Sequence, residues 1–514
     1  MNKLSRRDIL KLGMVTAGGA ALSLALPRTL TAMQSADRPN ILVLVFDTMS
    51  APHLSVNGYQ RSTTPNFEAF AQNATVFHSH YSNGSFTTPG TASILTGLAP
   101  WSHRAIGPGG LVRRDLLTNN LFHAVGSAYH RIGFTQNLWA EMLLRQFHAD
   151  IDLHLPTTSF AYPNPMLLGE LDHEDPISYI AYDDFLVGGV KLDTPYPGSV
   201  LLGLLDIATS RGRNLDRSLR SGESGAVFNN YYYYQHREVF QGILESVRTA
   251  RTAQNRPYLG YFHLWSPHEP YLPADEYKKL FDDQMDFPRK PEHAFAPSPI
   301  NNRKLFHYRR IYDQYIANVD AEFGRFMHSM EQNGLLENTY VVILSDHGQL
   351  FERGVHGHAS RLLYDGVIHV PMMIAAPGQT RRVDVYEPTS NLDLLPTLVH
   401  LAGGQMPERH EGRILPELGG ESQPARPIFS MLASETPAYQ PLKRGTFVLR
   451  KGSRKLMLLS GYQGYEDASE MYDVENDPDE LQDLSQEDPE SKKIMLEELL
   501  DARQDADAKL PKGV

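Results

Sequence analysis

The residues ILVLVFDT at positions 41–48 form the segment that decides the fold. An unbroken apolar run of this length is typical of a strand buried on both faces of a parallel sheet, with helices covering each face. Shorter apolar segments at 258–264, 340–344 and 370–376 each follow a helical or polar stretch. Strands that alternate with helices in this way predict a doubly wound α/β core.

Helical spacing fills some of the stretches between these strands. Thr64-Pro65 predicts an N-cap followed by the first residue of a helix. The apolar residues of 316–330 recur at helical intervals until Gly334, which predicts the end of that helix. Residues 105–225 are rich in glycine, proline and polar residues, and we interpret them as insertions over the core that could shape a substrate pocket.

The chain from about residue 426 onward has a different pattern. Short apolar segments at 428–432, 446–449 and 455–459 predict a small antiparallel sheet, and a helix is expected near 491–505. We expect this sheet to pack on the core and to close one side of the pocket. The mature chain is therefore divided into a large α/β domain over 37–425 and a small C-terminal α+β subdomain over 426–514.

The first residues resemble an export signal. SRRDILK at 5–11 is a twin-arginine pattern, a weakly apolar run covers 12–26, and Leu30-Thr31-Ala32 precedes a plausible cleavage point. The apolar run is too short for a transmembrane helix, which needs roughly 20 residues. We predict that residues 1–36 are a twin-arginine signal, that the mature protein is periplasmic or extracellular, and that it keeps no membrane span.

Composition and charge exclude several classes of protein and of functional site. The 514 residues are 41% hydrophobic and 21% charged, which is ordinary for a soluble globular protein and excludes global disorder. The net charge of −12 makes nucleic acid an unfavourable partner. The chain has no cysteine, which excludes disulfides, thiolate metal sites and a cysteine nucleophile. The oligomeric state is not indicated by the sequence.

Two polar clusters follow predicted strands. Asp47-Thr48 comes directly after the first strand, and Ser345-Asp346-His347-Gly348 follows 340–344. Ligands of open α/β sheets bind beyond the carboxyl ends of the strands, so we expect these clusters to meet. Carboxylate oxygens and an imidazole nitrogen suit a divalent cation, and we predict that Asp47, Asp346 and His347 bind one such ion. The alternative for Asp47 is a helix cap.

A third polar element is rich in hydroxyl groups. TTPGTASILTG at 87–97 places threonines just before a predicted helix, whose free N–H groups and dipole favour an anion. The alternative role for Thr87 is that of a helix cap. A cation, a hydroxyl and a helix N-terminus together suit attack on a tetrahedral centre such as phosphate or sulfate.

These segments resemble the type I sulfatases of the alkaline phosphatase superfamily, in the same order along nearly the whole mature chain. PHEPY at 267–271 is similar to their His-x-Pro element, and the other matching segments are 38–47, 64–67, 87–97, 344–348, 392–397 and 470–478. The resemblance implies a large mixed, mostly parallel sheet between helices, with a small C-terminal antiparallel sheet plus helix. It also implies that 37–425 is a sulfatase-like catalytic domain that hydrolyses esters.

The chain departs from that family at its reactive residue. Type I sulfatases use formylglycine, made from the first residue of Cys/Ser-x-Pro-x-Arg, whereas this chain has Thr87-Thr88-Pro89-Gly90-Thr91. Threonine is not a formylglycine precursor, so no formylglycine is expected. Superfamily relatives with an unmodified threonine nucleophile act on phosphoesters. A phosphothreonine can be opened by water, whereas a sulfated threonine lacks the exit that the formylglycine diol provides, so Thr87 favours phosphoesters.

The resemblance also suggests roles for further residues. His268 and His358 are candidates for the acid that protonates the leaving group, or else are structural histidines. His103 and Thr88 are predicted substrate contacts. His263, on an apolar strand, is predicted to be a core histidine with its hydrogen bonds satisfied.

The cation and the activity stay open at this point. The carboxylates of the resembling family favour calcium, whereas His347 and the replacement of a second aspartate by Thr48 favour manganese or zinc. One function is an exported metal-dependent hydrolase of small sulfate or phosphate esters. The alternative is a catalytically silent relative that binds an anionic glycan or a lipid head group.

Overall fold

The computed structural model describes residues 38–161, 225–228, 233–253, 256–283, 285, 287–296, 298–433 and 439–511. The predicted signal at 1–36 and residues 162–224 of the predicted insertion lie outside these residues. The described part of that segment, 105–161, supplies two strands of the central sheet and helices that pack on it, so its interpretation as an insertion over the core is wrong. Within the described part of the chain, no helix is both long enough and apolar enough to cross a membrane.

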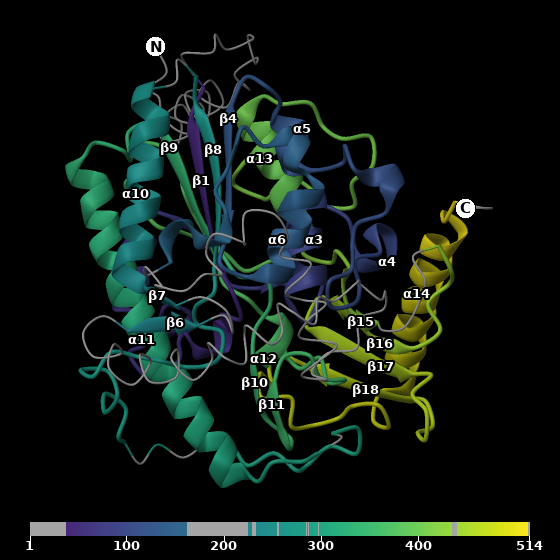
Figure 1. Cartoon of the computed structure of the whole chain (residues 1–514). Coiled ribbons are helices and arrows are strands. Elements are labelled where there is room, and N and C mark those ends of the chain that lie inside the picture. The colour runs from purple at the N-terminus through teal and green to yellow at the C-terminus, as the bar shows by residue number, and fades with distance from the viewer. Residues whose placement is uncertain are drawn as a thin grey trace, which may run out of the picture.

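An eight-stranded sheet forms the centre of the molecule, with the strand order β13-β2-β12-β9-β1-β8-β4-β5 (Figure 1). The strand predicted from ILVLVF pairs in parallel with a neighbour on each side, and β12 runs antiparallel to β9 and β2. The predicted mixed, mostly parallel α/β sheet is therefore confirmed. The strands are β1 (Asn40–Phe46), β2 (Thr75–Phe77), β4 (His130–Thr135), β5 (Leu153–His154), β8 (Tyr258–Leu264), β9 (Thr339–Leu344), β12 (Met372–Ala375) and β13 (Val383–Val385).

Helices cover both faces of this sheet because successive side chains of β1 point to opposite faces. Ile41, Val43 and Val45 pack in one buried cluster, beneath α3, α5, α6 and α13, and the alternate residues of the strand pack in the other, beneath α2, α10 and α11 (Figure 1). The helices are α2 (Pro65–Ala71), α3 (Thr87–Thr96), α5 (Leu121–Val125), α6 (Leu138–Gln146), α10 (His236–Ala253), α11 (Asn302–Gln332) and α13 (Leu394–Ala402).

Helix α3 approaches the end of β9 very closely. A Cβ atom at Gly90 would collide with the carbonyl oxygen of Asp346, so only glycine fits in this turn of the helix. The Ser82 hydroxyl donates to the same carbonyl from the segment that precedes α3. The first turn of α3 is thereby fixed against the residues that follow β9.

A second, four-stranded antiparallel sheet occupies the C-terminal part, as predicted, with a long helix beside it (Figure 1). Lys455 of this sheet is fully buried, and its Nζ lies 2.6 Å from Asp365 and 2.7 Å from Glu480. Asp365 begins α12 (Asp365–Ile368) in the large domain, so this ion group joins the two parts. The elements are β15 (Ile428–Ala433), β16 (Gly445–Lys451), β17 (Arg454–Ser460), β18 (Ala468–Asp473) and α14 (Pro489–Ala508).

The buried ion group gives a prediction about stability. Lys455→Met should lower the free energy of unfolding by about 3–5 kcal/mol, because two buried carboxylates lose their cation. Lys451→Met, in the neighbouring strand, should cost less than about 1 kcal/mol, since Lys451 and its partner Glu498 are 40% and 28% exposed and Glu498 stays hydrated. Urea denaturation followed by circular dichroism measures both values. Equal losses would show that the Lys455 group does not join the two parts.

Candidate active site

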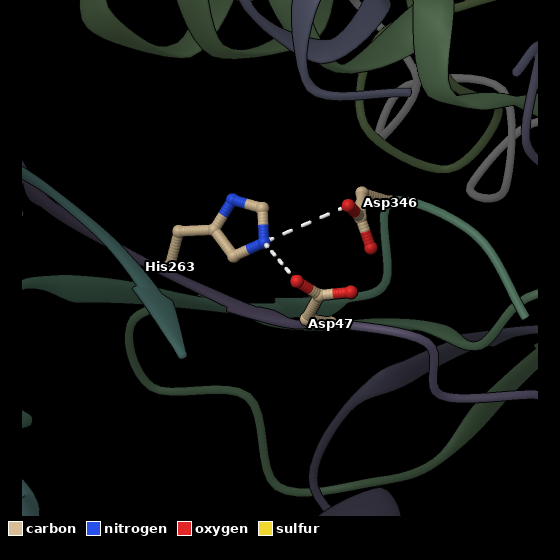
Figure 2. A group of neighbouring side chains, drawn as sticks. All are labelled: Asp47, His263 and Asp346. Carbon is tan, nitrogen blue, oxygen red and sulfur yellow. Dashed lines mark ion pairs between the residues drawn. The ribbon is translucent and has the colours of Figure 1, made fainter. Parts of the chain in front are cut away.

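Three buried ligand groups meet at the carboxyl end of the central strands (Figure 2). Asp47 follows β1, Asp346 follows β9, and His263 belongs to β8, so they come from three adjacent strands. One ligand atom from each lies within 4.8 Å of the others. The structure thus brings together the two aspartates that the sequence predicted at one site.

His347 joins the same group from the other side. Its Nε2 lies 3.4 Å from Asp47 Oδ1 and 3.6 Å from Asp346 Oδ2. Its Nδ1 donates to the carbonyl of Gly348 at 3.0 Å, which leaves the lone pair of Nε2 facing the carboxylates. We refer to Asp47, Asp346, His263 and His347 as the acidic cluster.

The acidic cluster has the properties of a cation site. All four side chains are fully buried, and Asp47 Oδ1, Asp346 Oδ2, His263 Nε2 and His347 Nε2 have no hydrogen-bond partner among the described residues. Burial and the charge of Asp47 raise the pKa of Asp346. Two buried carboxylates beside imidazole lone pairs fit a divalent cation, which would satisfy atoms that lack a partner.

Electrostatics inside the cluster follow from this crowding. Burial raises the pKa of Asp47, but the imidazoles of His268, His263 and His347 outweigh it and hold the pKa well below its ordinary value. Burial lowers the pKa of His347, whereas the charges of Asp346 and Asp47 raise it, and the raising effect dominates. Asp47 therefore keeps its negative charge, which attracts a cation, whereas Asp346 takes up a proton more readily than an ordinary carboxyl.

The prediction for His263 is wrong. Its Nδ1 lies 3.4 Å from both Thr91 Oγ1 and Tyr261 Oη, but its Nε2 is unpartnered and lies 3.7 Å from Asp47 and 3.6 Å from Asp346. A core histidine with satisfied hydrogen bonds was expected because the residues around it are apolar. The order of the strands places it beside the aspartates, since β8 pairs directly with β1.

Thr48 takes the strained position after Asp47. It has a φ of 61°, which is costly for a β-branched residue. The turn points its N–H at Asp346 Oδ1, at 3.4 Å, and its carbonyl accepts a hydrogen bond from Tyr312 at 2.6 Å. The backbone of Thr48 thus supports the acidic cluster.

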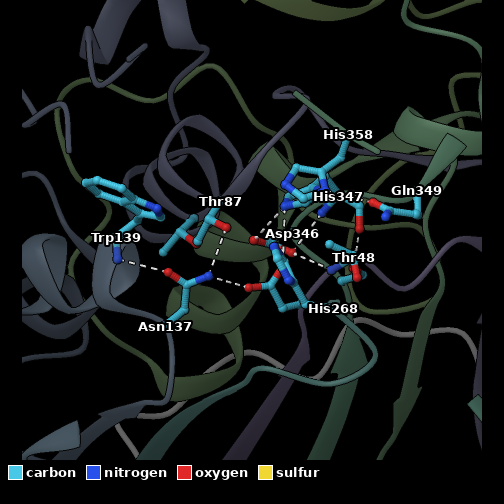
Figure 3. Close-up of polar contacts among 12 residues, drawn as sticks. Thr48, Thr87, Asn137, Trp139, His268, Asp346, His347, Gln349 and His358 are labelled. Carbon is cyan, nitrogen blue, oxygen red and sulfur yellow. Dashed lines mark hydrogen bonds and ion pairs between the residues drawn. The ribbon is translucent and has the colours of Figure 1, made fainter. Parts of the chain in front are cut away.

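Thr87 is linked to the acidic cluster by one side chain (Figure 3). The Asn137 Nδ2 donates to Thr87 Oγ1 at 3.0 Å and to Asp47 Oδ2 at 2.5 Å. Its Oδ1 accepts from the Trp139 N–H at 2.9 Å and so caps α6. Sequence reasoning missed Asn137 because residues 105–225 were interpreted as insertions, so neither the strand before Asn137 nor the helix that it caps was predicted.

The two predicted substrate contacts lie in different surroundings. Thr88 is buried in the first turn of α3, and its Oγ1 has no partner among the described residues. His103 is fully buried, and its ring nitrogens lie 3.2 Å from Ser93 Oγ and 3.0 Å from the Ala105 N–H. Burial lowers its pKa to about 3. His103 therefore supports α3 from within the core, because both nitrogens are used by its own segment, and the expected substrate contact is corrected.

His268 and His358 lie next to the acidic cluster (Figure 3). The ring centroid of His358 lies 4.6 Å from that of His347 and 4.8 Å from that of His268. His358 Nδ1 donates to Gln349 Oε1 at 2.7 Å, and His268 Nδ1 donates to the carbonyl of Glu269 at 2.6 Å. Burial lowers the pKa of His358 well below its ordinary value, and His347 and His268 lower it further. Sequence reasoning did not identify Gln349.

A cavity of about 790 Å³ lies elsewhere in the molecule, between the segment after β1 and the C-terminal sheet. Its lining includes Tyr59, Phe287, Tyr386 and Arg450, and no member of the acidic cluster. The chemistry of the orphaned ligand atoms, rather than cavity size, therefore identifies the candidate active site.

In metal-free protein, we predict opposite changes in the free energy of unfolding for substitution of Asp346, in the acidic cluster, and of Asp393, which is buried outside it. Asp346→Asn should raise the free energy of unfolding at neutral pH by about 1–3 kcal/mol, because the charged form of a carboxyl with a raised pKa destabilises the fold. Asp393→Asn should lower it by about 3–5 kcal/mol, since the buried Asp393 pairs with Arg426 at 2.7 Å. Urea denaturation after dialysis against a chelator measures both.

Added Mn²⁺ extends that test. A concentration 100 times the dissociation constant should stabilise the parent by about 2.7 kcal/mol and the Asp346→Asn variant by much less. Two results together would contradict the cation site. One is that Mn²⁺ and Zn²⁺ leave the free energy of unfolding of the parent unchanged. The other is that Asp346→Asn lowers that free energy.

Two family models match large parts of the chain. The family model described as sulfatase matches residues 39–404, and one described as the C-terminal part of N-sulphoglucosamine sulphohydrolase matches 354–505. The choline-sulfatase of Rhizobium meliloti is 22% identical over 87% of this chain and 83% of its own length. The arylsulfatase of Clostridium perfringens is 24% identical over 74% of this chain and 78% of its own length.

Solved structures share the fold. The phosphonate monoester hydrolase of Agrobacterium radiobacter has a TM-score of 0.63 at 20% identity, covering 91% of this chain and 96% of that one. The phosphonate monoester hydrolase of Silicibacter pomeroyi has a TM-score of 0.62 at 18% identity, covering 91% and 96%.

Proposed function

This chain belongs to the sulfatase family and is a hydrolase of ester bonds, and we propose that it is an exported, metal-dependent phosphoesterase whose nucleophile is Thr87. The observation that supports this proposal is that the Asn137 side-chain nitrogen donates hydrogen bonds to both Thr87 Oγ1 and Asp47 Oδ2. A hydroxyl tied in this way to a predicted cation ligand is placed to act on a substrate bound at that cation.

The residues that would hold a divalent cation are Asp47, Asp346 and His347, with His263 beside them. Such a cation, when bound, would lower the pKa of a nearby hydroxyl and offset the negative charge that develops in the transition state. The unpartnered buried oxygens and nitrogens of these residues support metal dependence.

Thr87 lies where a nucleophile is needed. Asn137 donates to one lone pair of Thr87 Oγ1, which fixes the rotamer of the hydroxyl and leaves its proton free to be lost. The N–H groups of Thr87 and Thr88, at the start of α3, have no carbonyl partner within the helix and are suited to donate to the non-bridging oxygens of a phosphate. Attack by Oγ forms the bond to phosphorus as the bond to the leaving oxygen breaks.

His268 is the better candidate for the acid. Its Nδ1 is held by the Glu269 carbonyl, so Nε2 is the nitrogen that can pass a proton to the leaving oxygen. His358 is less suited to that role, because its pKa is depressed and the neutral ring already donates its one proton to Gln349. Water then attacks phosphorus and gives its proton to the neutral His268 Nε2 as the bond to Thr87 Oγ breaks, which releases phosphate and restores both residues.

The nature of the nucleophile favours phosphate over sulfate. Phosphorus in a phosphothreonine remains open to in-line attack by water, which returns the threonine. A sulfated formylglycine expels sulfate because its second hydroxyl lets it collapse to the aldehyde. A sulfated threonine has no such second hydroxyl and cannot expel sulfate in this way. Small anionic phosphoesters are therefore the proposed substrates, and sulfate esters are the second candidate because of the family.

The twin-arginine sequence at 5–11 supports export. We place the mature protein in the periplasm or outside the cell. An anionic glycan or lipid head group held without turnover is the competing function, which activity measurements distinguish.

Thr87 gives the principal prediction. Thr87→Ala should lower kcat/KM for an activated aryl phosphodiester by about 1000-fold or more, whereas Thr87→Ser should retain activity within about 100-fold, because serine keeps the hydroxyl. Thr96→Ala, at the other end of α3, removes a hydroxyl that donates only to the carbonyl of Ala92 and should leave kcat/KM within about threefold. An aryl sulfate should be a poorer substrate than the phosphodiester.

Two outcomes of that experiment would change the proposal. Equal turnover by Thr87→Ala and the parent would point to direct attack by water. No turnover of sulfate, phosphomonoester or phosphodiester by the parent with Mn²⁺, Zn²⁺ or Ca²⁺ would favour the silent, ligand-binding function.

Asn137 is predicted to matter for activity beyond its helix cap. Asn137→Ala and Asn120→Ala should each lower the free energy of unfolding by about 1–2 kcal/mol, since both side chains cap helices. Only Asn137→Ala should lower kcat/KM, by about 100-fold, because Asn120 does not contact Thr87. Similar activity in the two variants would limit Asn137 to a structural role.

A further inference from the structure

His263 differs from the other buried histidines in what its ring nitrogens contact. His80 is equally buried, but its nitrogens lie 2.9 Å from Thr389 Oγ1 and 2.9 Å from Asn391 Oδ1. His263 Nε2 instead faces two carboxylates and has no hydrogen-bond partner among the described residues. An unpaired imidazole nitrogen in such a place requires a partner that the described side chains do not supply.

The spacing around His263 Nε2 is that of atoms around a shared ion. Its separations from Asp47 Oδ2 and Asp346 Oδ2, 3.7 and 3.6 Å, are too long for hydrogen bonds. Two ligand atoms each about 2.1 Å from one metal ion, at a tetrahedral angle, lie about 3.4 Å apart. The separations for His347 Nε2, 3.4 and 3.6 Å, are of the same size. Both imidazoles thus stand at ligand spacing from the same carboxylate pair.

Two hydroxyl groups hold the other side of the His263 ring. Thr91 Oγ1 and Tyr261 Oη each lie 3.4 Å from Nδ1, one from α3 and one from the same strand as His263. A proton on Nδ1 faces these oxygens and leaves the lone pair of Nε2 directed at the carboxylates. A lone pair aimed at two carboxylates is repelled unless a cation lies between them, so the arrangement favours a metal-bound His263.

We propose, building on the metal dependence in the proposed function, that His263 is a direct ligand and that the site prefers a first-row transition metal to calcium or magnesium. His263, from the strand beside β1, adds an imidazole nitrogen to the carboxylate oxygens of Asp47 and Asp346. Two imidazoles with two carboxylates suit zinc, manganese, iron or cobalt, whereas calcium and magnesium take oxygen ligands.

Metal titration of the full chain tests this proposal. Metal-free parent, His263→Gln and the matched control His80→Gln are titrated with Zn²⁺, Mn²⁺ and Ca²⁺ against a chromophoric chelator. We expect the parent to bind Zn²⁺ at least about 100-fold more tightly than Ca²⁺, and His263→Gln to lose about 100-fold in Zn²⁺ and Mn²⁺ affinity. The Ca²⁺ affinity of His263→Gln should change less than about tenfold, and His80→Gln should bind all three ions as the parent does.

Pulsed electron paramagnetic resonance of the Mn²⁺-loaded parent, with histidine labelled by ¹⁵N, gives a second measurement that needs no substitution. Two coordinated imidazole nitrogens support the proposal. A single nitrogen, or unchanged Zn²⁺ affinity in a folded His263→Gln variant, would overturn it and leave His263 as a neighbour of the site. If His263→Gln does not fold, Thr91→Val should still lower Zn²⁺ affinity by about 10-fold through the loss of one support for Nδ1.

These measurements separate the two proposals. Two nitrogen ligands in a protein that hydrolyses no ester would overturn the proposed function alone. Ester hydrolysis with one nitrogen ligand would overturn this inference alone.

Discussion

Two carboxylates buried side by side are the constraint on which the rest of the structure depends. Asp47 and Asp346 end adjacent strands of the sheet and are closed off from solvent. Without compensating positive charge this placement costs several kcal/mol. The surrounding residues reduce that cost. Two imidazoles face the carboxylate oxygens, and the Asn137 amide donates a hydrogen bond to Asp47. The strained turn at Thr48 directs an N–H at Asp346. The energetic cost of this buried pair indicates that the two carboxylates have a functional role.

The same constraint explains the position of α3. The helix has to approach the residues after β9 closely enough for Thr87 to share a hydrogen-bond donor with Asp47. Gly90 permits that approach because any side chain there would meet the Asp346 carbonyl. The Thr87 hydroxyl and the charged pair are thus held by one packed unit, with His103 filling the core behind the helix. A small shift of α3 would disturb both at once.

The sequence predicts those parts of the site that follow directly from a strand. The apolar run before Asp47 and the one before Asp346 mark where each strand ends, and parallel strands bring such ends together. The surroundings of His263 were predicted wrongly, and Asn137 was missed, for a different reason. Their proximity depends on β8 lying beside β1 and β4 beside β8, and the order of strands in a sheet cannot be read from local patterns. His103 was placed wrongly because a sequence shows a histidine near a helix but not where its ring nitrogens point.

The ion group of Lys455, Asp365 and Glu480 has a consequence for the order in which the protein matures. The segment that begins with Asp365 is also bonded to the residues after β1 and β9, through the Ser50 hydroxyl on the Gly366 carbonyl and the Gly348 N–H on the Val367 carbonyl. Lys455 and Glu480 are made by the ribosome long after β1. The hydrogen bonds and ion pairs behind the acidic cluster are therefore complete only near the end of synthesis, so the acidic cluster gains this support in the finished chain and not in the nascent one.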